Sequence, residues 1–562
     1  MKAPTPYLLL DYEDFFDEKQ PSNRISLIKH ISRKNILFEL TALNYRLKPK
    51  DKVHIDSSIE TQIRELEYFA QIPELSNYYL QIFKSINNNK KIKPIIFSRQ
   101  TCLFAIEEIV NSSDIKEIED FKMGKVEVWD AILKYILAVN TAITYIKEDQ
   151  NDKDFFLESL NSKLLPLNEL AVETDPIYIP YRGFKLIEFF LKNSVLKDEV
   201  ESYFQENYNM KPNHFIFNLM SMYMANNTID PGLNFYYRVP EEKKYFFDKL
   251  SDHFPNNETH KLISIKKSPF IKVGNLEYLI VDNSFLLDKT YSQFINDFWF
   301  DRVKKIKDER GVSKYSIQLY RSIFGYFFEH YVSQILKKSF VNYKYSKLLM
   351  FDELKIEISK KPLELADIYL RYNNKIFLAQ VKSGSIYDSE KFGGNIESLY
   401  KNNRNEFFKN FGINQLIESI KNIDIYMHLL DSKFPKGHIY KVYPCIIVND
   451  KAFQTPLIAN IFNIRFQELL KDFDNKKIVI KSLTLIHISE LESVENFLNS
   501  KPEEIWELLE YNQRDKRYIP PFYNSLQRWN SELFYSDRVK QLLETLIQNC
   551  NSNDNEAVNG AM

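Results

Sequence analysis

The stretch ADIYLRYNNKIFLAQVKSG (Ala366–Gly384) contains two short runs of strand-favouring residues joined by the polar pair Asn373-Asn374. The first run opens with Asp367, and the second ends in a Gln-Val-Lys tripeptide. Branched and aromatic residues favour β-strands, and asparagine tolerates the positive φ angles that a two-residue hairpin turn requires. The stretch therefore predicts a β-hairpin that carries polar groups at the far ends of both strands.

A symmetric turn fixes which side chains of this hairpin meet. It places Asp367 directly opposite Gln380, and because side chains alternate along a strand, both share a face with Lys382. A four-residue loop centred on the same point keeps this register, whereas an odd-numbered loop loses it. We expect one face to be a compact polar site and the other to be core. The residues of the expected core face are Ile368, Leu370, Phe377, Ala379 and Val381.

The polar residues suit the hydrolysis of phosphodiesters. Mg²⁺ prefers oxygen ligands in octahedral geometry and keeps several waters, so one carboxylate, one amide oxygen and a second carboxylate nearby would form a sufficient site. A lysine beside the metal can position the attacking water and offset the charge that develops on the phosphate. Asp367 and Gln380 are therefore predicted to bind Mg²⁺, or Mn²⁺, and Lys382 to act on the water and the scissile phosphate.

The same residues resemble the signature of a known superfamily. Asp367, followed after twelve residues by Gln380, Val381 and Lys382, is similar to the core motif of the PD-(D/E)XK, or restriction-endonuclease-like, nucleases. Some members, notably Mrr-like restriction enzymes, carry glutamine in place of the second acid. The resemblance covers about residues 320–450. It implies a restriction-endonuclease-like αβββαβ domain that cleaves nucleic acid with Mg²⁺.

The resemblance gives roles to two further residues. The family carries a glutamate on the helix before the sheet, and Glu329 in FGYFFEHYVSQIL would complete the metal site and restore the negative charge that Gln380 lacks. Many members carry a polar residue on the helix after the lysine strand, and Gln415 in GINQLIESIKN matches it as an accessory residue. A solvated helix face is the alternative interpretation of both. Ala366 stands where the family motif has proline.

Basic residues on both sides of the motif form a candidate nucleic-acid-binding surface. Phosphate contacts at such clusters would hold a duplex, although a basic run is also typical of a solvated helix. The candidate residues are Lys304, Lys305, Lys307, Arg310 and Arg321 before the motif, and Lys401 and Arg404 after it.

Changes of periodicity divide the chain into regions of mixed α+β and α/β character. A mostly helical N-terminal region precedes the nuclease-like domain, with apolar residues near a helical spacing at 59–72, 126–146 and 183–206. The predicted regions are a helical region over 1–260, a connector over 261–318, the nuclease-like domain over 319–500, C-terminal helices over 501–549 and a disordered tail over 550–562. A hairpin around Gly274 and a helix at 292–311 are expected in the connector, and a second helix at 315–338 leads from it into the nuclease-like domain.

The nuclease-like region is expected to alternate strands with helices. Beside the hairpin, its predicted elements are an extended run at 345–358, a helix at 412–423, a strand at 440–448, a helix at 456–473 and a strand at 476–488.

Composition indicates a folded chain without a membrane span. Of its 562 residues, 44% are hydrophobic and 27% are charged, and the net charge is −1, so nucleic-acid contacts would need clustered basic residues. Three cysteines without a C-x-x-C pair exclude a cysteine-based zinc site and favour a reducing cytoplasm. The chain contains no P-loop, hydrolase-elbow or H-E-x-x-H motif.

The sequence thus predicts a Mg²⁺-dependent nuclease that acts on nucleic acid, with double-stranded DNA favoured over RNA and the choice between them left open. By resemblance, a helical region fused to such a nuclease looks like a bacterial restriction or antiphage-defence effector, whose helical part would sense a trigger or bind a protein partner. The oligomeric state stays open. The alternative is a non-catalytic nucleic-acid- or protein-binding scaffold with a degenerate nuclease fold, since the Gln380 amide binds Mg²⁺ more weakly than an acid.

Overall fold

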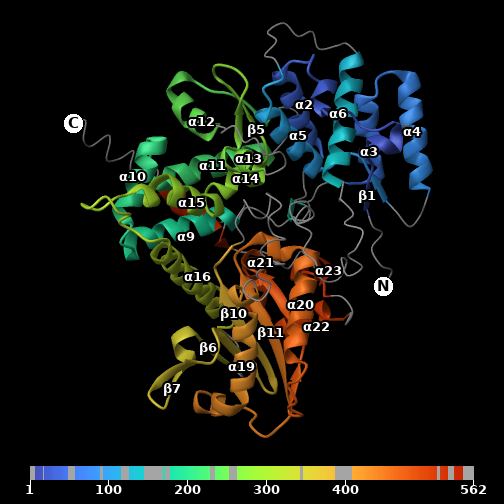
Figure 1. Ribbon diagram of the computed structural model, residues 1–562. Helices are drawn as coiled ribbons and strands as arrows, with labels where there is room; N and C mark the ends of the chain where they lie inside the picture. Colours follow the sequence, from blue (N-terminus) through green and yellow to red (C-terminus); the bar gives the residue numbers. More distant parts are fainter. Residues whose placement is uncertain are drawn as a thin grey trace. The chain divides into compact units, whose positions relative to one another are not determined.

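A six-stranded mixed sheet lies at the centre of the C-terminal part of the chain in the computed structural model (Figure 1). The structure describes residues 7–16, 18–47, 57–88, 93–115, 126–144, 169–170, 178–227, 234–251, 262–341, 346–385, 408–514, 519–529, 537–538 and 540–548. Contacts divide the chain into two units. Unit 1 consists of residues 1–150, 182–187 and 198–298, and unit 2 of residues 151–181, 188–197 and 299–562.

Unit 1 is mainly helical. A bidentate ion pair is buried in it, in which Arg99 Nε and Nη2 donate to Asp282 Oδ2 and Oδ1 at 2.8 and 2.9 Å. Its helices are α1 Tyr12–Phe15, α2 Arg33–Arg46, α3 Ile59–Phe69, α4 Pro73–Asn87, α5 Arg99–Asn111, α6 Val126–Thr144, α10 Lys197–Tyr208, α11 Pro212–Asn227, α12 Lys244–Leu250, α13 Ile263–Lys267, α14 Asn283–Asp288 and α15 Ser292–Asp297.

Small sheets complete unit 1. Strands β1 (Tyr7–Leu9) and β2 (Lys93–Ile95) pair in parallel. The predicted hairpin around Gly274 is confirmed, because β4 (Phe270–Lys272) and β5 (Glu277–Ile280) are antiparallel. They join β3 (Tyr236–Arg238) in a three-stranded sheet. The segment 261–318 was expected to be a connector. Its residues up to Phe298 belong to unit 1, and those from Trp299 onward belong to unit 2.

Two predicted helices are broken. The run 183–206 forms α9 (Tyr178–Asn193) and α10, because the backbone N–H of Leu196 turns back to Ser194 Oγ at 3.0 Å. The residues of α9 divide between the units. The run 292–311 leaves α15 through a π turn at Phe298–Arg302 and a 3₁₀ turn at Val303–Lys305.

The sheet of unit 2 combines antiparallel and parallel pairs. Its order is β12-β11-β10-β9-β6, and β13 also pairs with β11. Pairs β6–β9 and β9–β10 are antiparallel, whereas β11 is parallel to β10, β12 and β13. The strands are β6 Ser346–Met350, β9 Ile368–Tyr372, β10 Lys375–Lys382, β11 Tyr440–Val448, β12 Ile478–Ile480 and β13 Thr484–His487.

The remaining elements of unit 2 surround this sheet. The 3₁₀ turn Phe351–Leu354 separates β6 from β7, so the extended run 345–358 is not one strand. The other elements are β7 Lys355–Ile358, β8 Lys361–Glu364, α16 Ile317–Ser339, α19 Ile413–Tyr426, α20 Pro456–Leu470, α21 Ile488–Ser500, α22 Glu504–Asn512 and α23 Phe522–Trp529. The protein is thus a mixed α/β chain with a helical N-terminal part, as predicted. In the described part of the chain, no helix is long and apolar enough to cross a bilayer.

The register of the β9–β10 hairpin agrees with the prediction. Residues 373 and 374 form the turn, with Asn373 at a φ of 51°, and Ala379 pairs with Ile368. Continuing this register by one residue puts Asp367 opposite Gln380. The hairpin therefore delivers both polar side chains to the same end of the sheet.

The two faces of the hairpin differ from the prediction of one polar and one apolar face. On the polar residues' side, Tyr369, Ile376 and Leu378 are fully buried in a core formed with α19 and α20. Because β10 and β11 are covered by α19, this face is apolar along most of its length. The polar site is therefore confined to the strand ends.

A buried ion pair holds the opposite end of the same face. Arg371 Nη2 donates to Asp431 Oδ1 at 3.1 Å, its Nε donates to Oδ2, and Tyr369 Oη donates to Oδ2 at 2.9 Å. Burial alone would raise the pKa of Asp431, but these bonds hold it below its ordinary value. Since Asp431 follows α19, the interaction fixes this helix against β9.

A second buried network positions α16. Tyr331 Oη donates to Glu492 Oε1 on α21 at 2.5 Å. Arg538 pairs with both oxygens of Glu495 and donates to Tyr331 Oη at 3.2 Å. The turn of α16 next to Glu329 is therefore fixed by hydrogen bonds to buried charged groups.

Candidate functional site

Asp367 lies directly before β9, and hydrogen bonds from two backbone N–H groups fix its carbonyl and its carboxylate. Its carbonyl oxygen accepts from the Phe351 N–H at 2.8 Å, and its carboxylate Oδ2 accepts from the Val381 N–H at 2.6 Å. Lys382 Nζ lies 3.8 Å from the same Oδ2. The Asp367 side chain is 13% exposed and the Lys382 side chain 18%. Burial raises the pKa of Asp367, although Lys382 and the Val381 N–H oppose the shift.

The Gln380 amide fills the space between Asp367 and α19. The residue is 3% exposed. In one orientation, Nε2 donates to Ser419 Oγ at 3.3 Å and Oε1 accepts from Lys382 Nζ at 3.5 Å. Turned over, the amide nitrogen donates to Asp367 Oδ2 and Oδ1 at 3.0 and 3.2 Å, and the amide oxygen accepts from Ser419 Oγ. Without a cation, the turned-over orientation gives both amide atoms complementary partners, whereas in the first orientation the amide oxygen faces the carboxylate at these distances.

This spacing fits a pair of ligands on one small cation. Two adjacent ligands of an octahedral Mg²⁺ are about 3.0 Å apart, because each lies about 2.1 Å from the metal at a right angle to the other. The Gln380 Oε1 position lies 3.0 and 3.2 Å from the oxygens of Asp367. A carboxylate and an amide oxygen are also the hard donors that Mg²⁺ prefers.

Other ligands of such a cation would be few. Among the described residues, no group of three or more His, Cys, Asp or Glu side chains is arranged to hold a metal ion. Mg²⁺ commonly keeps several waters and binds substrate phosphates beside one or two protein groups. Asp367 and Gln380 would therefore anchor the cation and leave the other positions to water and phosphate oxygens.

Glu329 lies on the side of α16 that approaches the strand ends. One turn earlier, a side chain built on Gly325 would come within 3.6 Å of Ser383 Oγ, directly after β10. Burial and repulsion from Asp367 and Glu364 raise the pKa of Glu329. The structure thus brings Glu329 into the electrostatic neighbourhood of Asp367, where it adds negative charge without contacting the carboxylate.

Glu364 is an exposed acidic residue, not named in the sequence analysis, whose charge interacts with that of Asp367. It ends β8, opposite Lys355 of β7. Burial and repulsion from Asp367 raise its pKa. The β7–β8 turn uses Ser359 and Lys360 at φ angles of 52° and 63°, a conformation for which asparagine or glycine is the usual signal. The only sequence signal for Glu364 was its place three residues before Asp367.

The start of α19 shapes the position of Lys382. Gly412 precedes this helix with a φ of 84°. A Cβ atom on it would lie 2.5 Å from Lys382 Cε and 3.4 Å from Gln380 Cβ. Glycine is therefore required here for its positive φ and for the close passage of the lysine side chain.

The polar residue of α19 that contacts Gln380 is Ser419. Gln415, the predicted accessory residue, is exposed, and its backbone carbonyl accepts from Ser419 Oγ at 2.9 Å. Gln415 thus contributes its backbone to the site. Sequence reasoning missed Ser419 because its role depends on the height at which α19 crosses β10.

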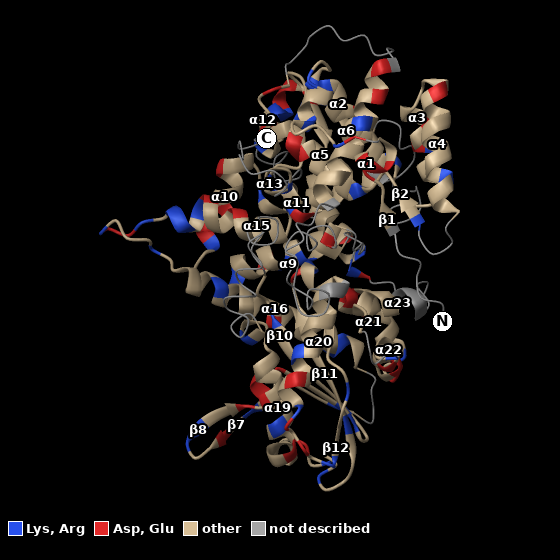
Figure 2. Ribbon diagram, turned by 45° about the vertical axis from the view of Figure 1, so that its right-hand side comes forward, with Lys and Arg blue, Asp and Glu red and all other residues tan. Residues whose placement is uncertain are grey.

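The predicted basic residues of unit 2 are exposed. Lys304, Lys305, Lys307, Arg310 and Arg321 all lie at the surface. Lys304 Nζ lies 5.5 Å from the ring centre of Phe300, which is itself 50% exposed. Lys401 and Arg404 lie outside the described residues, as does the predicted tail. Acidic and basic residues are interspersed over the molecule in Figure 2.

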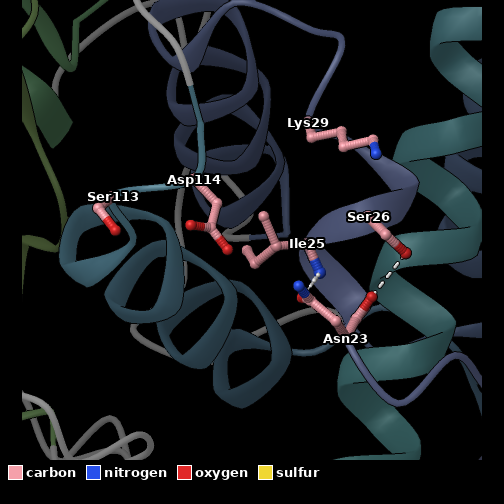
Figure 3. A pocket seen from close by; sticks show the side chains of 6 residues that line it. All are labelled: Asn23, Ile25, Ser26, Lys29, Ser113 and Asp114. Carbon is pink, nitrogen blue, oxygen red and sulfur yellow. Dashed lines mark hydrogen bonds between the residues drawn. The ribbon is translucent and has the colours of Figure 1, made fainter.

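An open pocket of about 460 Å³ lies in unit 1 (Figure 3). Its lining residues are Asn23, Ile25, Ser26, Lys29, Ser113 and Asp114. Asn23 Oδ1 accepts from the Ile25 N–H at 3.1 Å, and Ser26 Oγ donates to the Asn23 carbonyl at 2.6 Å. These bonds stabilise the local 3₁₀ turn, and the pocket contains none of the predicted site residues.

Comparisons of the chain with protein-family models, with curated proteins and with solved structures found no match. The assignment of a function consequently depends on the chemistry of Asp367, Gln380, Lys382 and their neighbours.

Replacing Gly412 by alanine tests the packing of Lys382. Gly437→Ala is the matched control, because Gly437 has a similar φ of 86° but nothing within 4 Å of its Cβ position. Both variants should lose about 1–2 kcal/mol to left-handed backbone strain. Gly412→Ala should lose about 1 kcal/mol more in urea unfolding, because Lys382 must move. Equal losses would show that the lysine does not lie against Gly412.

The raised carboxyl pKa values predict a pH-dependent effect of Glu329→Gln. A carboxyl with a raised pKa binds its proton more tightly in the folded chain, so its contribution to stability is present at low pH and lost as pH rises through the folded pKa. The variant should therefore be more stable than the wild type by about 0.5 kcal/mol near pH 8 and lose this advantage towards pH 4.

Thermal unfolding of both proteins in EDTA across this pH range measures the difference. Glu418→Gln, a change of an exposed glutamate paired with Lys421 at 2.9 Å, sets the background. A stability difference for Glu329→Gln that is constant with pH would contradict the raised pKa of Glu329.

Proposed function

We propose that unit 2 is a metal-dependent nuclease of the PD-(D/E)XK type. The observation that carries the proposal is the spacing of the Gln380 Oε1 position from the oxygens of Asp367, which suits two adjacent ligands of Mg²⁺. The order of the elements that form and cover the main sheet also supports it. Apart from the β7–β8 hairpin inserted between β6 and β9, α16, β6, β9, β10, α19 and β11 follow the αβββαβ order implied by the resemblance.

In this proposal, Asp367 and Gln380 hold Mg²⁺ or Mn²⁺ at the strand ends. Bound Mg²⁺ lowers the pKa of a coordinated water and polarises a phosphate oxygen. Lys382, 3.8 Å from Asp367 Oδ2 and 3.5 Å from Gln380 Oε1, orients the attacking water and stabilises the charge that develops on the phosphate. The water oxygen bonds to phosphorus, the bond to the leaving sugar oxygen breaks, and protons exchange with solvent.

Glu329 and Glu364 supply negative charge that Gln380 lacks. Both interact electrostatically with Asp367, and both also interact with Lys382. Their negative charges favour a cation at the site. Both glutamates also interact electrostatically with a second lysine, Lys355.

Double-stranded DNA is the proposed substrate. The exposed residues Lys304, Lys305, Lys307, Arg310 and Arg321 would contact phosphates along the duplex. By the resemblance, the biological role would be bacterial restriction or antiphage defence, with unit 1 binding a trigger or a protein partner.

A non-catalytic scaffold is the second candidate. The observation that favours it is the turned-over Gln380 amide, whose nitrogen donates to both oxygens of Asp367 and satisfies this buried carboxylate without a cation. The two functions thus differ in whether a cation replaces this hydrogen bond.

Cleavage of plasmid DNA and of RNA in Mg²⁺ or Mn²⁺ separates the candidates. Asp367→Ala and Lys382→Ala should each lower the rate by about 100-fold or more, since each removes a group from the reacting centre, and EDTA should abolish cleavage. Asp472→Ala and Lys471→Ala, exposed neighbours after α20, are the matched controls and should retain the wild-type rate. Equal cutting by all five proteins, or none by the wild type, would contradict a catalytic role.

A further inference from the structure

Ser419 Oγ contacts the amide nitrogen of Gln380 in one orientation and the amide oxygen in the other. Its hydroxyl has a single proton to donate and lone pairs to accept. In one arrangement the proton goes to the Gln415 carbonyl at 2.9 Å, and the hydroxyl oxygen accepts from Gln380 Nε2 at 3.3 Å. The amide oxygen then faces Asp367.

The other arrangement reverses each of these bonds. The Ser419 hydroxyl donates to the amide oxygen at 3.3 Å and gives up the Gln415 carbonyl, while the amide nitrogen faces Asp367. The Gln415 carbonyl has an alternative donor in the backbone of α19, so releasing the hydroxyl leaves no unpaired acceptor. The Ser419 hydroxyl therefore makes two hydrogen bonds when the amide oxygen faces Asp367 and one when the amide nitrogen does, so it favours the first orientation by about one neutral hydrogen bond.

We propose that Ser419 is a positioning residue that holds the Gln380 amide with its oxygen toward Asp367 when a cation is bound. This inference rests on the metal site of the proposed function. Without a cation, an amide oxygen 3.0 and 3.2 Å from the two oxygens of Asp367 is repelled by them, so the amide turns and its nitrogen donates to Asp367. With a cation between them the oxygens are both attracted to it, and Ser419 satisfies the amide nitrogen, which is otherwise buried without an acceptor.

The proposal explains how an amide can serve where the family has an acid. A carboxylate offers an oxygen whichever way it is turned, whereas an amide offers an oxygen in only one of two orientations. Ser419 is 4% exposed and lies on α19, which the Arg371–Asp431 ion pair fixes against β9. The orienting hydroxyl is therefore held by a rigid helix rather than by a loop.

Substitution of Gln380 supplies a test that a merely structural role of Ser419 would not pass. In Gln380→Glu the side chain has two equivalent oxygens, so no hydroxyl is needed to orient it. Ser419→Ala should therefore weaken Mn²⁺ binding in the wild-type background by about three- to tenfold, the value of one neutral hydrogen bond. In the Gln380→Glu background it should change Mn²⁺ binding by less than about twofold, and Ser419→Thr should retain wild-type binding.

Mn²⁺ binding to the full chain is measured without nucleic acid, from the paramagnetic resonance signal of the free ion. The Asp367-dependent site is identified by comparison with Asp367→Ala, and thermal unfolding verifies that each variant is folded. No effect of Ser419→Ala in the wild-type background, or the same loss in both backgrounds, overturns the orienting role.

The outcomes also separate this inference from the proposed function. Mn²⁺ binding that depends on Asp367 but not on Ser419 overturns the inference and leaves the nuclease proposal standing. A chain that shows the predicted dependence on Ser419 but cleaves no nucleic acid contradicts the nuclease and supports the inference. Mn²⁺ binding that is unchanged by Asp367→Ala overturns both.

Discussion

The close approach of Asp367 and Gln380 across the β9–β10 hairpin is the constraint on which the candidate site depends. A buried carboxylate opposite a buried amide has two stable solutions, a hydrogen bond between them or a cation shared by their oxygens. The hairpin register sets their separation, and the surrounding groups influence which solution is adopted. Lys382 lies beside both side chains, and Ser419 touches the amide from α19.

The ionised carboxylates around this pair lower the stability of the folded chain in the absence of a cation, as their raised pKa values indicate. Burial raises the pKa of Asp367, and burial with repulsion from Asp367 raises those of Glu329 and Glu364. Such repulsion is a cost in the free chain that a bound cation would offset. Two rigid supports oppose it, the Arg371–Asp431 pair beside α19 and the Tyr331–Glu492 bond beside Glu329.

Sequence reasoning was most successful where the local chemistry was strong. The positive φ of Asn373 fixed the hairpin register, and the apolar run 440–448 is β11 residue for residue. It failed where the signal was weak or the contact was tertiary. The run 476–488 is two strands, since β12 and β13 pair with separate parts of β11. The turn at Ser359-Lys360 lacks the asparagine or glycine that usually indicates a tight turn, so β8 and Glu364 were not predicted. The contact of Ser419 with Gln380 depends on where α19 lies over the sheet, which the sequence does not indicate. The expectation of a wholly polar face was wrong because α19 and α20 cover it.

An anomalous difference map from crystals of the protein grown with Mn²⁺ tests the central claim most directly. The account predicts a peak about 2.1–2.2 Å from an oxygen of Asp367 and from Oε1 of Gln380, with the amide nitrogen on Ser419. A map without a peak at this position, in which the amide nitrogen donates to Asp367, would contradict it.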